Sequence, residues 1–331
     1  MMQRRALFPL ATGALALPFI ARPGRAQKST VLKLTFADTQ AHPVYDVLQR
    51  FAANVREQTN GAADLHVFSI GQLGSGTNIM TGLQTGIIDF CAHTSGFIDT
   101  TFPQFQVVDL PFLFSSEAAA EHMLDGPIGQ QLLAMMPAKG IYGLGYGHWG
   151  WRVVSTIGRQ VPTPPDIRGL KIRVQPGAIF SATFQALGAI PTAIDLTEVY
   201  LALSQKAVDA VETPIISVAA TKQDEGITTV NATNHVYNAG VLMASKFKFD
   251  RLPAAVQAAI RSCVPDLTAD WRKTIATKTQ EASAQFAGKN IPIVTVDRDA
   301  YKAATSAVYQ QFKPIVGAEL YDDVMREAAH G

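Results

Sequence analysis

The sequence is poor in cysteine, in net charge and in long apolar runs. Its two cysteines, Cys91 and Cys263, belong to no C-x-x-C pair, and Cys91 follows an apolar run, which favours a buried free thiol over a disulfide. The 28 basic and 27 acidic residues nearly balance, so a nucleic-acid or anionic-membrane surface is not expected. No apolar run of about 20 residues occurs after the N-terminal region, so no membrane anchor is predicted in the mature chain.

Catalytic and metal-binding motifs are also missing. The chain contains no H-E-x-x-H, no G-x-S-x-G and no G-x-x-x-x-G-K-[ST]. Its seven histidines are scattered without metal-ligand spacing. Two glycine-rich stretches, "GQLGSG" (71–76) and "GLGYG" (143–147), lack phosphate-binding residues, and we interpret both as turns. We therefore expect neither a cofactor nor a metal.

The N-terminus has the pattern of an export signal. Arg4 and Arg5 precede an apolar run over residues 6–20, and small residues favour cleavage between Ala26 and Gln27. The twin arginines indicate the twin-arginine route, with an ordinary secretory signal as the alternative. Residues 1–26 are thus predicted to be a signal, and the mature protein is expected in the periplasm.

The remaining chain, long enough for about two domains, alternates strand and helix patterns twice. In the first unit the predicted order is strand 31–37, helix 44–58, strand 64–69, helix 77–86 and strand 87–93. The second unit has strand 170–174, helix 178–188, strand 190–195, helix 197–207 and strand 208–213. This order predicts mostly parallel sheets with helices on their faces. Beyond it, helix is predicted over about 253–286, with Pro265 as a kink, then strand 291–297 and helix 298–328.

The two units contain similar segments. "TNIMTGLQTGIIDF" (77–90) and "TEVYLALSQKAVDA" (197–210) share a predicted N-cap threonine and, at the same spacing, Asp89 and Asp209. Two similar α/β units in an exported chain without catalytic motifs indicate a hinged, two-lobed ligand-binding protein.

Acidic and basic residues in the second unit are candidates for the site. Asp209 is interpreted as holding a turn and Glu198 as serving a helix N-terminus, whereas Glu212 lies on a strand expected to face the cleft. Arg173 ends its strand just before a Pro-Gly break, where open α/β sheets bind ligands. Arg152 lies between the units, and either guanidinium fits a carboxylate with two parallel hydrogen bonds. Spacing alone leaves a surface or structural role open for both arginines.

A longer stretch carries a family resemblance. Residues 169–214 read "GLKIRVQPGAIFSATFQALGAIPTAIDLTEVYLALSQKAVDAVETP" and resemble the signature region of the TRAP-transporter substrate-binding proteins, the DctP-like family. "GQLGSGTNIMTGLQTGIIDF", "FQVVDLPFLF" and "GWRVVST" resemble further blocks of that family in the same order. The resemblance implies two α/β lobes joined by crossing strands and backed by a long helix. It places lobe I at 27–150 plus about 239–277, and lobe II at 151–238 plus about 278–331.

The resemblance also implies the roles of several residues. Arg173 would bind a ligand carboxylate through two hydrogen bonds, with Arg152 as a second contact. The chain departs from the family pattern at Thr213, where an asparagine is common, and at Leu196, where phenylalanine is common. Further expected contacts are Glu212, Trp151, and, after the strands of lobe I, Asp38, Thr39, Thr94 and Ser95. His93 is interpreted as structural. Trp149, Phe97 and Tyr237 could join Trp151 in an apolar pocket or belong to the core.

The predicted function is capture of a small organic acid without chemistry. The ligand is expected to be a mono- or dicarboxylate, with aromatic and 2-oxo acids left open, and the expected partners are membrane subunits of a TRAP transporter. Two alternatives remain at this level: a sensor module that presents its ligand to a receptor, and a secreted hydrolase with Glu212 or Asp209 as its base.

Overall fold

The computed structural model describes residues 29–74 and 76–330, so the predicted signal at 1–26 lies outside the described residues. The strands are β1 Thr30–Phe36, β2 Ala63–Phe68, β3 Phe90–Thr94, β4 Ile141–Thr156, β5 Lys171–Val174, β6 Ile190–Ala193, β7 Ala210–Pro214, β8 Thr229–Ser245 and β9 Ile293–Val294. The helices are α1 Val44–Gln58, α2 Thr77–Thr85, α3 Ser95–Ile98, α4 Glu117–Asp125, α5 Pro127–Met135, α6 Ala178–Ala186, α7 Val199–Ser204, α8 Ile215–Ala220, α9 Lys246–Phe249, α10 Ala254–Ser262, α11 Val264–Gly288, α12 Arg298–Ala304, α13 Ser306–Val316 and α14 Ala318–His330. Short 3-10 turns η1 Pro103–Asp109, η2 Met136–Lys139, η3 Pro164–Ile167, η4 Leu196–Glu198 and η5 Gln223–Glu225 connect them.

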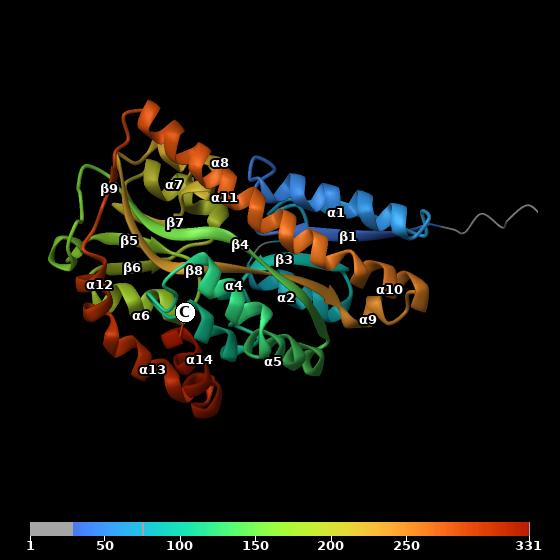
Figure 1. Cartoon of the computed structure of the whole chain (residues 1–331). Coiled ribbons are helices and arrows are strands. Elements are labelled where there is room, and N and C mark those ends of the chain that lie inside the picture. Colours follow the sequence, from blue (N-terminus) through green and yellow to red (C-terminus); the bar gives the residue numbers. More distant parts are fainter. Residues whose placement is uncertain (1–28, 75, 331) are drawn as a thin grey trace, which may run out of the picture.

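The described strands form one continuous nine-stranded sheet (Figure 1). Their order is β2-β1-β3-β8-β4-β7-β5-β6, with β9 beside β8. The outer groups β2-β1-β3 and β7-β5-β6 are parallel, as predicted. Between them, β4 and β8 are long, antiparallel to each other, and pair with β7 and β3 respectively. The sheet is therefore mixed, and the crossing strands that the family resemblance implies are present.

The stretch 143–147 lies inside β4, so its interpretation as a turn was wrong. A Cβ atom on Gly147 would lie 2.1 Å from Cδ2 of Trp271, and one on Gly143 would lie 2.5 Å from Cδ2 of Leu133. Such distances are shorter than any van der Waals contact, so these glycines allow helices α11 and α5 to approach the strand closely.

Helix α11 lies across both ends of the sheet. It packs on β4 and contacts α1 at one end and α8 at the other, as Figure 1 shows. Its 25 residues span about 37 Å at 1.5 Å per residue. The predicted continuous helix from 253 is in fact two helices, because α10 ends at Ser262 and α11 begins at Val264. Pro265 lies in the first turn of α11, directly after the break between the two helices, where its missing N–H costs nothing.

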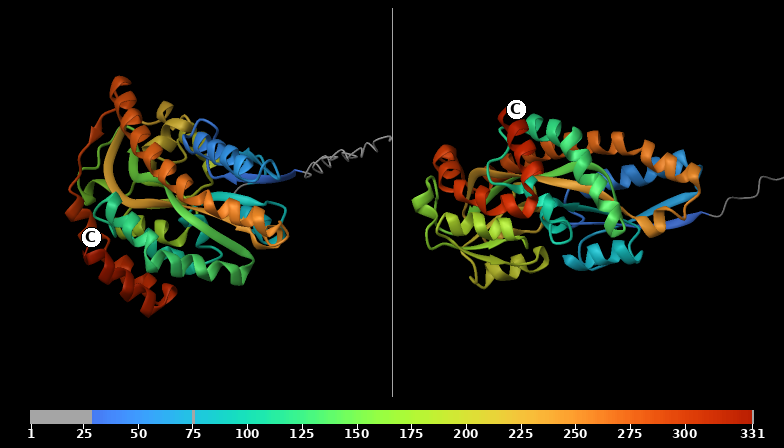
Figure 2. Two further views of the ribbon diagram at one scale, coloured as in Figure 1. Left: turned by 45° about the vertical axis from the view of Figure 1, so that its right-hand side comes forward. Right: turned by 90° about the horizontal axis from the view of Figure 1, so that it is seen from below.

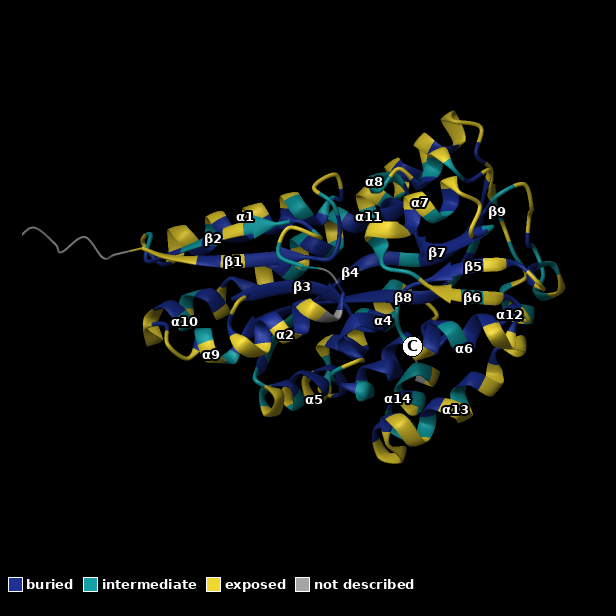
Figure 3. Cartoon of the chain, turned by 180° about the vertical axis from the view of Figure 1, so that it is seen from behind, coloured by how far each residue is buried: buried dark blue, intermediate teal, exposed yellow. Residues whose placement is uncertain are grey.

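The C-terminal helices α12–α14 lie together at one end of the molecule, in red in Figure 2. There α13 packs on α6 and η1, while α14 packs on α4 and α5. Figure 3 shows the central strands of the sheet as deeply buried, with exposed residues on the edge strand β6 and on the outer faces of the helices. The predicted lobe boundaries near residues 150 and 239 fall where the β4–β8 register shifts, between His148 and Trp151. The division into lobes at these bounds stays a prediction.

The similarity between the two units has a structural basis. The backbone N–H of Lys33 donates to Asp89 Oδ2 at 2.8 Å, and that of Lys171 donates to Asp209 Oδ2 at 3.2 Å. Each aspartate thus ties the turn before its strand to the neighbouring strand, which confirms the structural interpretation of Asp209. The predicted threonine N-caps were wrong: Gly76 precedes α2, and an aspartate, Asp195, caps the turn before α7.

Candidate functional site

A small cavity lies between the two ends of the sheet, beyond the carboxyl ends of β1, β3, β5 and β7. Its walls comprise Ala37, Asp38, Thr94, Phe97, Trp149, Arg152, Arg173, Gln175, Leu196, Thr213, Ser217 and Asn238. This is the position where open α/β sheets bind ligands. The cavity measures about 20 Å³, which holds about one water molecule. A molecule larger than water can enter this cavity only when its walls separate.

Six of the ten predicted contact residues line this cavity: Asp38, Thr94, Arg152, Arg173, Leu196 and Thr213. Four do not: Thr39, Ser95, Trp151 and Glu212. The hydroxyl of Thr39 donates to the carbonyl of Ala220, and that of Ser95 donates to Asp109 Oδ1 at 2.7 Å. Glu212 is fully buried behind Arg152.

The two neighbouring tryptophans lie on opposite sides of β4. In a regular strand, Trp149 and Trp151 would share one face. The register shift at Gly150, whose φ is +100°, breaks that alternation. Trp149 therefore lines the cavity, while Trp151 packs edge-on against Tyr237 at 5.5 Å between ring centroids. Of the predicted aromatic pocket, only Trp149 and Phe97 reach the cavity.

Arg173 is a buried cation without a carboxylate partner among the described residues. Its side chain is almost completely buried, and its one hydrogen bond there runs from Nε to the carbonyl of Ile194 at 2.9 Å. Burial, and to a smaller degree the nearby charge of Arg152, lower the pKa of Arg173 to about 10, although the charge of Glu212 opposes the change. The terminal nitrogens remain available to an anion in the cavity. Since β5 ends at Val174, the strand itself fixes this position.

Arg152 is held quite differently, by Glu212. Its Nε and Nη2 donate to the two carboxylate oxygens at 2.5 and 2.8 Å, and Nη2 also donates to the Glu212 carbonyl at 2.6 Å. Nη1 donates to Gln175 Oε1 at 3.0 Å. Glu212 also accepts from the Gln175 N–H at 2.9 Å and lies 3.4 Å from Nε2 of His235. Burial alone would raise the pKa of Glu212, but Arg152 and the His235 hydrogen bond lower it to about 2. The pair is a buried support that positions the cavity wall.

Four buried polar atoms of residues in the cavity wall have no hydrogen-bond partner in the described part of the chain. They are Thr94 Oγ1, Trp149 Nε1, Gln175 Nε2 and Asn238 Oδ1. Because buried polar groups are nearly always paired, these atoms can serve as donors and acceptors to a polar ligand. The sequence reasoning missed Gln175 and Asn238. Gln175 directly follows Arg173 and Val174 at a strand end, which was a usable signal, whereas Asn238 lies on the unpredicted strand β8.

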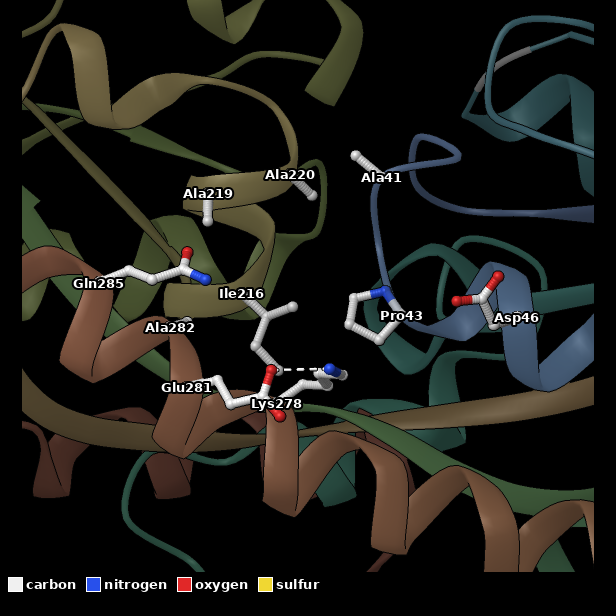
Figure 4. Close-up of a pocket in the computed structure, with 10 residues that line it drawn as sticks. All are labelled: Ala41, Pro43, Asp46, Ile216, Ala219, Ala220, Lys278, Glu281, Ala282 and Gln285. Carbon is white, nitrogen blue, oxygen red and sulfur yellow. Dashed lines mark hydrogen bonds and ion pairs between the residues drawn. The ribbon is translucent and has the colours of Figure 1, made fainter.

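Two hydrogen bonds close one side of the cavity. Ser217 Oγ on α8 donates to Asp38 Oδ2 at 2.7 Å, and Thr39 Oγ1 donates to the Ala220 carbonyl at 3.0 Å. Behind them lies a groove of about 360 Å³, with Pro43 and Ile216 on opposite walls and the Lys278–Glu281 ion pair on α11 below (Figure 4). Residues 38–43 and α8 therefore form a shared wall between the cavity and the groove.

A second polar cluster lies next to the cavity wall. Asp99 and Asp109 are buried, and each has one oxygen, Oδ2, without a partner within residues 29–74 and 76–330. Burial, and then the charge of Asp109, raise the pKa of Asp99 to about 8. His93 is buried too, with Nδ1 accepting the Thr94 N–H and its ring 4.3 Å from that of Phe97.

The described residues contain no group of three or more histidine, cysteine or acidic side chains placed to hold a metal ion. Cys91 and Cys263 are both buried and free. Within the same part of the chain, no helix combines the length and apolar character needed to cross a bilayer.

Comparison with known families decides the class of the protein. Residues 35–314 match the family model DctP, described as bacterial extracellular solute-binding protein, family 7. The chain belongs to this family. The resemblance to TRAP-transporter substrate-binding proteins is thereby confirmed, together with the two-lobed α/β fold.

Several periplasmic and sugar-acid binding proteins are similar to this chain over most of its length. The 2,3-diketo-L-gulonate-binding periplasmic protein YiaO of Escherichia coli (strain K12) is 30% identical, covering 82% of this chain and 84% of its own. The sugar acid binding protein DctPAm of Advenella mimigardefordensis, in complex with galactonate, superposes with a TM-score of 0.89 at 28% identity, covering 92% of this chain and 99% of that one. A TRAP periplasmic solute binding protein of Sulfurospirillum deleyianum with bound succinate superposes with a TM-score of 0.84 at 27% identity, covering 89% of this chain and 97% of that one.

Proposed function

We propose that this protein is a periplasmic solute-binding protein that captures a small organic acid by its carboxylate and delivers it to the membrane subunits of a TRAP transporter. The observation that carries the proposal is Arg173, a buried guanidinium that lines the cavity without a carboxylate partner among the described residues. An unpaired buried charge is costly. A ligand carboxylate would supply the missing partner through two charge-assisted hydrogen bonds, each contributing about 1.5–3 kcal/mol.

The other predicted contacts have unequal support. Thr94, Gln175 and Asn238 offer unpaired polar atoms, and Thr213 and Leu196 line the same cavity. Glu212 and Arg152 act as positioning residues, since their charges already satisfy each other. Relatives bind galactonate and succinate, which supports a small mono- or dicarboxylate for this chain as well.

We further propose that the protein catalyses no reaction. Both carboxylates that a hydrolase could use as a base are engaged elsewhere: Glu212 with Arg152, and Asp209 with the backbone N–H of Lys171. Export through a signal cleaved near Ala26 would place the mature chain in the periplasm. A sensor role would use the same cleft, and binding to purified membrane subunits distinguishes the two.

The test is a thermal-shift screen of the mature protein against mono-, di- and hydroxycarboxylic acids. A ligand at 100 times its Kd adds about 2.7 kcal/mol of stability. Acids that raise the melting temperature are then titrated into wild type, Arg173→Met and Arg168→Met, the last being an exposed arginine nearby. We expect Arg173→Met to abolish binding and Arg168→Met to leave it unchanged. Equal affinity of wild type and Arg173→Met would refute the proposed site.

A further inference from the structure

Asp38 is the acidic residue of the cavity wall, and its place follows from the strand before it. The strand β1 ends at Phe36, so Asp38 lies at the carboxyl end of β1, opposite Arg173 on β5. Its side chain is completely buried, and it lines the same cavity of about 20 Å³ as Arg173. Asp38 and Arg173 line the same cavity and are close enough for their charges to interact, so we expect a carboxylate bound to Arg173 to place its neighbouring carbon atom within reach of Asp38.

Two donors bond to the Asp38 carboxylate, and the His42 ring lies near it but beyond hydrogen-bond distance. The Thr39 N–H donates to Oδ1 at 2.8 Å, and the Ser217 hydroxyl donates to Oδ2 at 2.7 Å. His42 Nε2 lies 3.8 Å from Oδ2. Because His42 Nδ1 accepts the Val44 N–H at 3.3 Å, the proton of the neutral ring is on Nε2 and faces Asp38. The groups around Asp38 are hydrogen-bond donors, which favour an ionised carboxylate.

The protonation state of Asp38 is compatible with that role. Burial raises its pKa to about 7, whereas the bonds from Ser217 and Thr39 and the charge of Arg173 oppose the rise. At about pH 8 most molecules therefore carry the ionised form. A carboxylate has about four lone-pair sites, and the two short bonds from Ser217 and Thr39 leave acceptor capacity for a donor in the cavity.

We propose that Asp38 selects acids with a hydroxyl group next to the carboxylate held by Arg173, and rejects the corresponding 2-oxo acids. This inference rests on the proposed function. A 2-hydroxyl group donates its proton to Asp38. A 2-oxo group has only lone pairs to present, so it repels the carboxylate and gives it no hydrogen bond. One charge-assisted hydrogen bond of this kind corresponds to a preference of about 10- to 100-fold.

The experiment compares matched pairs of acids by calorimetry at about pH 8. The probes are pantoate with 2-oxopantoate, malate with oxaloacetate, and lactate with pyruvate. For each pair that binds, we expect wild type to prefer the hydroxy acid by about tenfold or more. The isosteric variant Asp38→Asn should bring the ratio to about one or reverse it, because its amide can donate to the oxo group.

Two further variants separate selection from structure. Asp195→Asn alters an aspartate near Arg173 that bonds to Thr197 and does not line the cavity; it should affect both acids of a pair alike. Ser217→Ala removes the bond to Asp38 and should weaken both acids while keeping a preference for the hydroxy acid.

The outcomes are distinguishable. If Arg173→Met abolishes binding but wild type takes hydroxy and oxo acids equally, Asp38 does not select the ligand and the proposed function stands. An unchanged ratio in Asp38→Asn likewise overturns the inference alone. If none of the six acids binds wild type, the inference is rejected for these acids, and the wider carboxylate screen then decides the proposed function.

Discussion

Replacing Glu212 by glutamine should destabilise the protein strongly. Glu212 accepts two side-chain hydrogen bonds from Arg152 and one from the Gln175 N–H. In Glu212→Gln, an amide NH₂ group would face the Arg152 guanidinium, which would stay buried without a counter-charge. The pKa of Glu212 is about 2 against an ordinary value of 4.5, and at 1.36 kcal/mol for each pH unit the pairing contributes about 3 kcal/mol. Breaking buried ion pairs elsewhere costs about 3–5 kcal/mol.

The assay is urea unfolding at pH 7, together with a thermal melt. We expect the free energy of unfolding to fall by about 3 kcal/mol or more, and the melting temperature by roughly 5–10 °C. The pKa of Glu212 is depressed, so the stabilisation is complete above about pH 4.5 and is lost as the pH falls through about 2. The double variant Arg152→Met/Glu212→Gln removes the stranded cation, and we expect it to be more stable than Glu212→Gln alone. A loss below about 1 kcal/mol in Glu212→Gln would refute the reasoning.

Three further predictions concern the site and the core. Arg173→Lys keeps the charge but not the planar pair of donors. The affinity for the bound acid, measured by calorimetry, should therefore fall by about tenfold or more while the melting temperature stays unchanged. A fall in affinity of less than about threefold would contradict the two-bond geometry. The pKa of Asp99 is raised to about 8, so the stability of the wild type should decline as the pH rises from about 5 to about 9. Asp99→Asn should therefore gain stability relative to the wild type over this range. An equal dependence of the two melting temperatures on pH would rule this out. Gly147→Ala places a Cβ 2.1 Å from the buried Trp271 ring and should lower the free energy of unfolding in urea by about 3 kcal/mol. The control Gly288→Ala, whose added Cβ has no atom within 4 Å, should not lower it. Equal stability of the two variants would contradict the packing argument.

Local sequence patterns predicted the parallel strands and the first helix well, because apolar spacing there follows one face of each element. Helix α1 was predicted with its observed limits, Val44 and Gln58. The crossing strands were not predicted from the residues. Four of the 16 residues of β4 are glycine, and glycine usually marks turns. Here the glycines face helices α5 and α11, and the packing on α11, which lies more than 100 residues further along the chain, leaves no local signal.

The site was predicted in outline and not in its supporting contacts. Arg173 could be found because its strand ends at a visible break in the sequence. Glu212 was correctly predicted to lie on a strand. Its ion pair with Arg152 could not be predicted, because it depends on the pairing of β4 with β7. Trp151 was predicted as a site residue, whereas Trp149 lines the cavity. The β-bulge at Gly150 changes which side of the strand these side chains occupy, and a single glycine does not reliably indicate a bulge.

The continuity of the sheet has a consequence for folding. The long strands β4 and β8 each begin among the strands of one lobe and end among those of the other. Neither lobe alone therefore contains all the strands that its backbone hydrogen bonds require. Cutting the chain at residue 150 would leave each half with a row of unpaired N–H and C=O groups. Because the lobes share these strands, we expect them to unfold together in one transition.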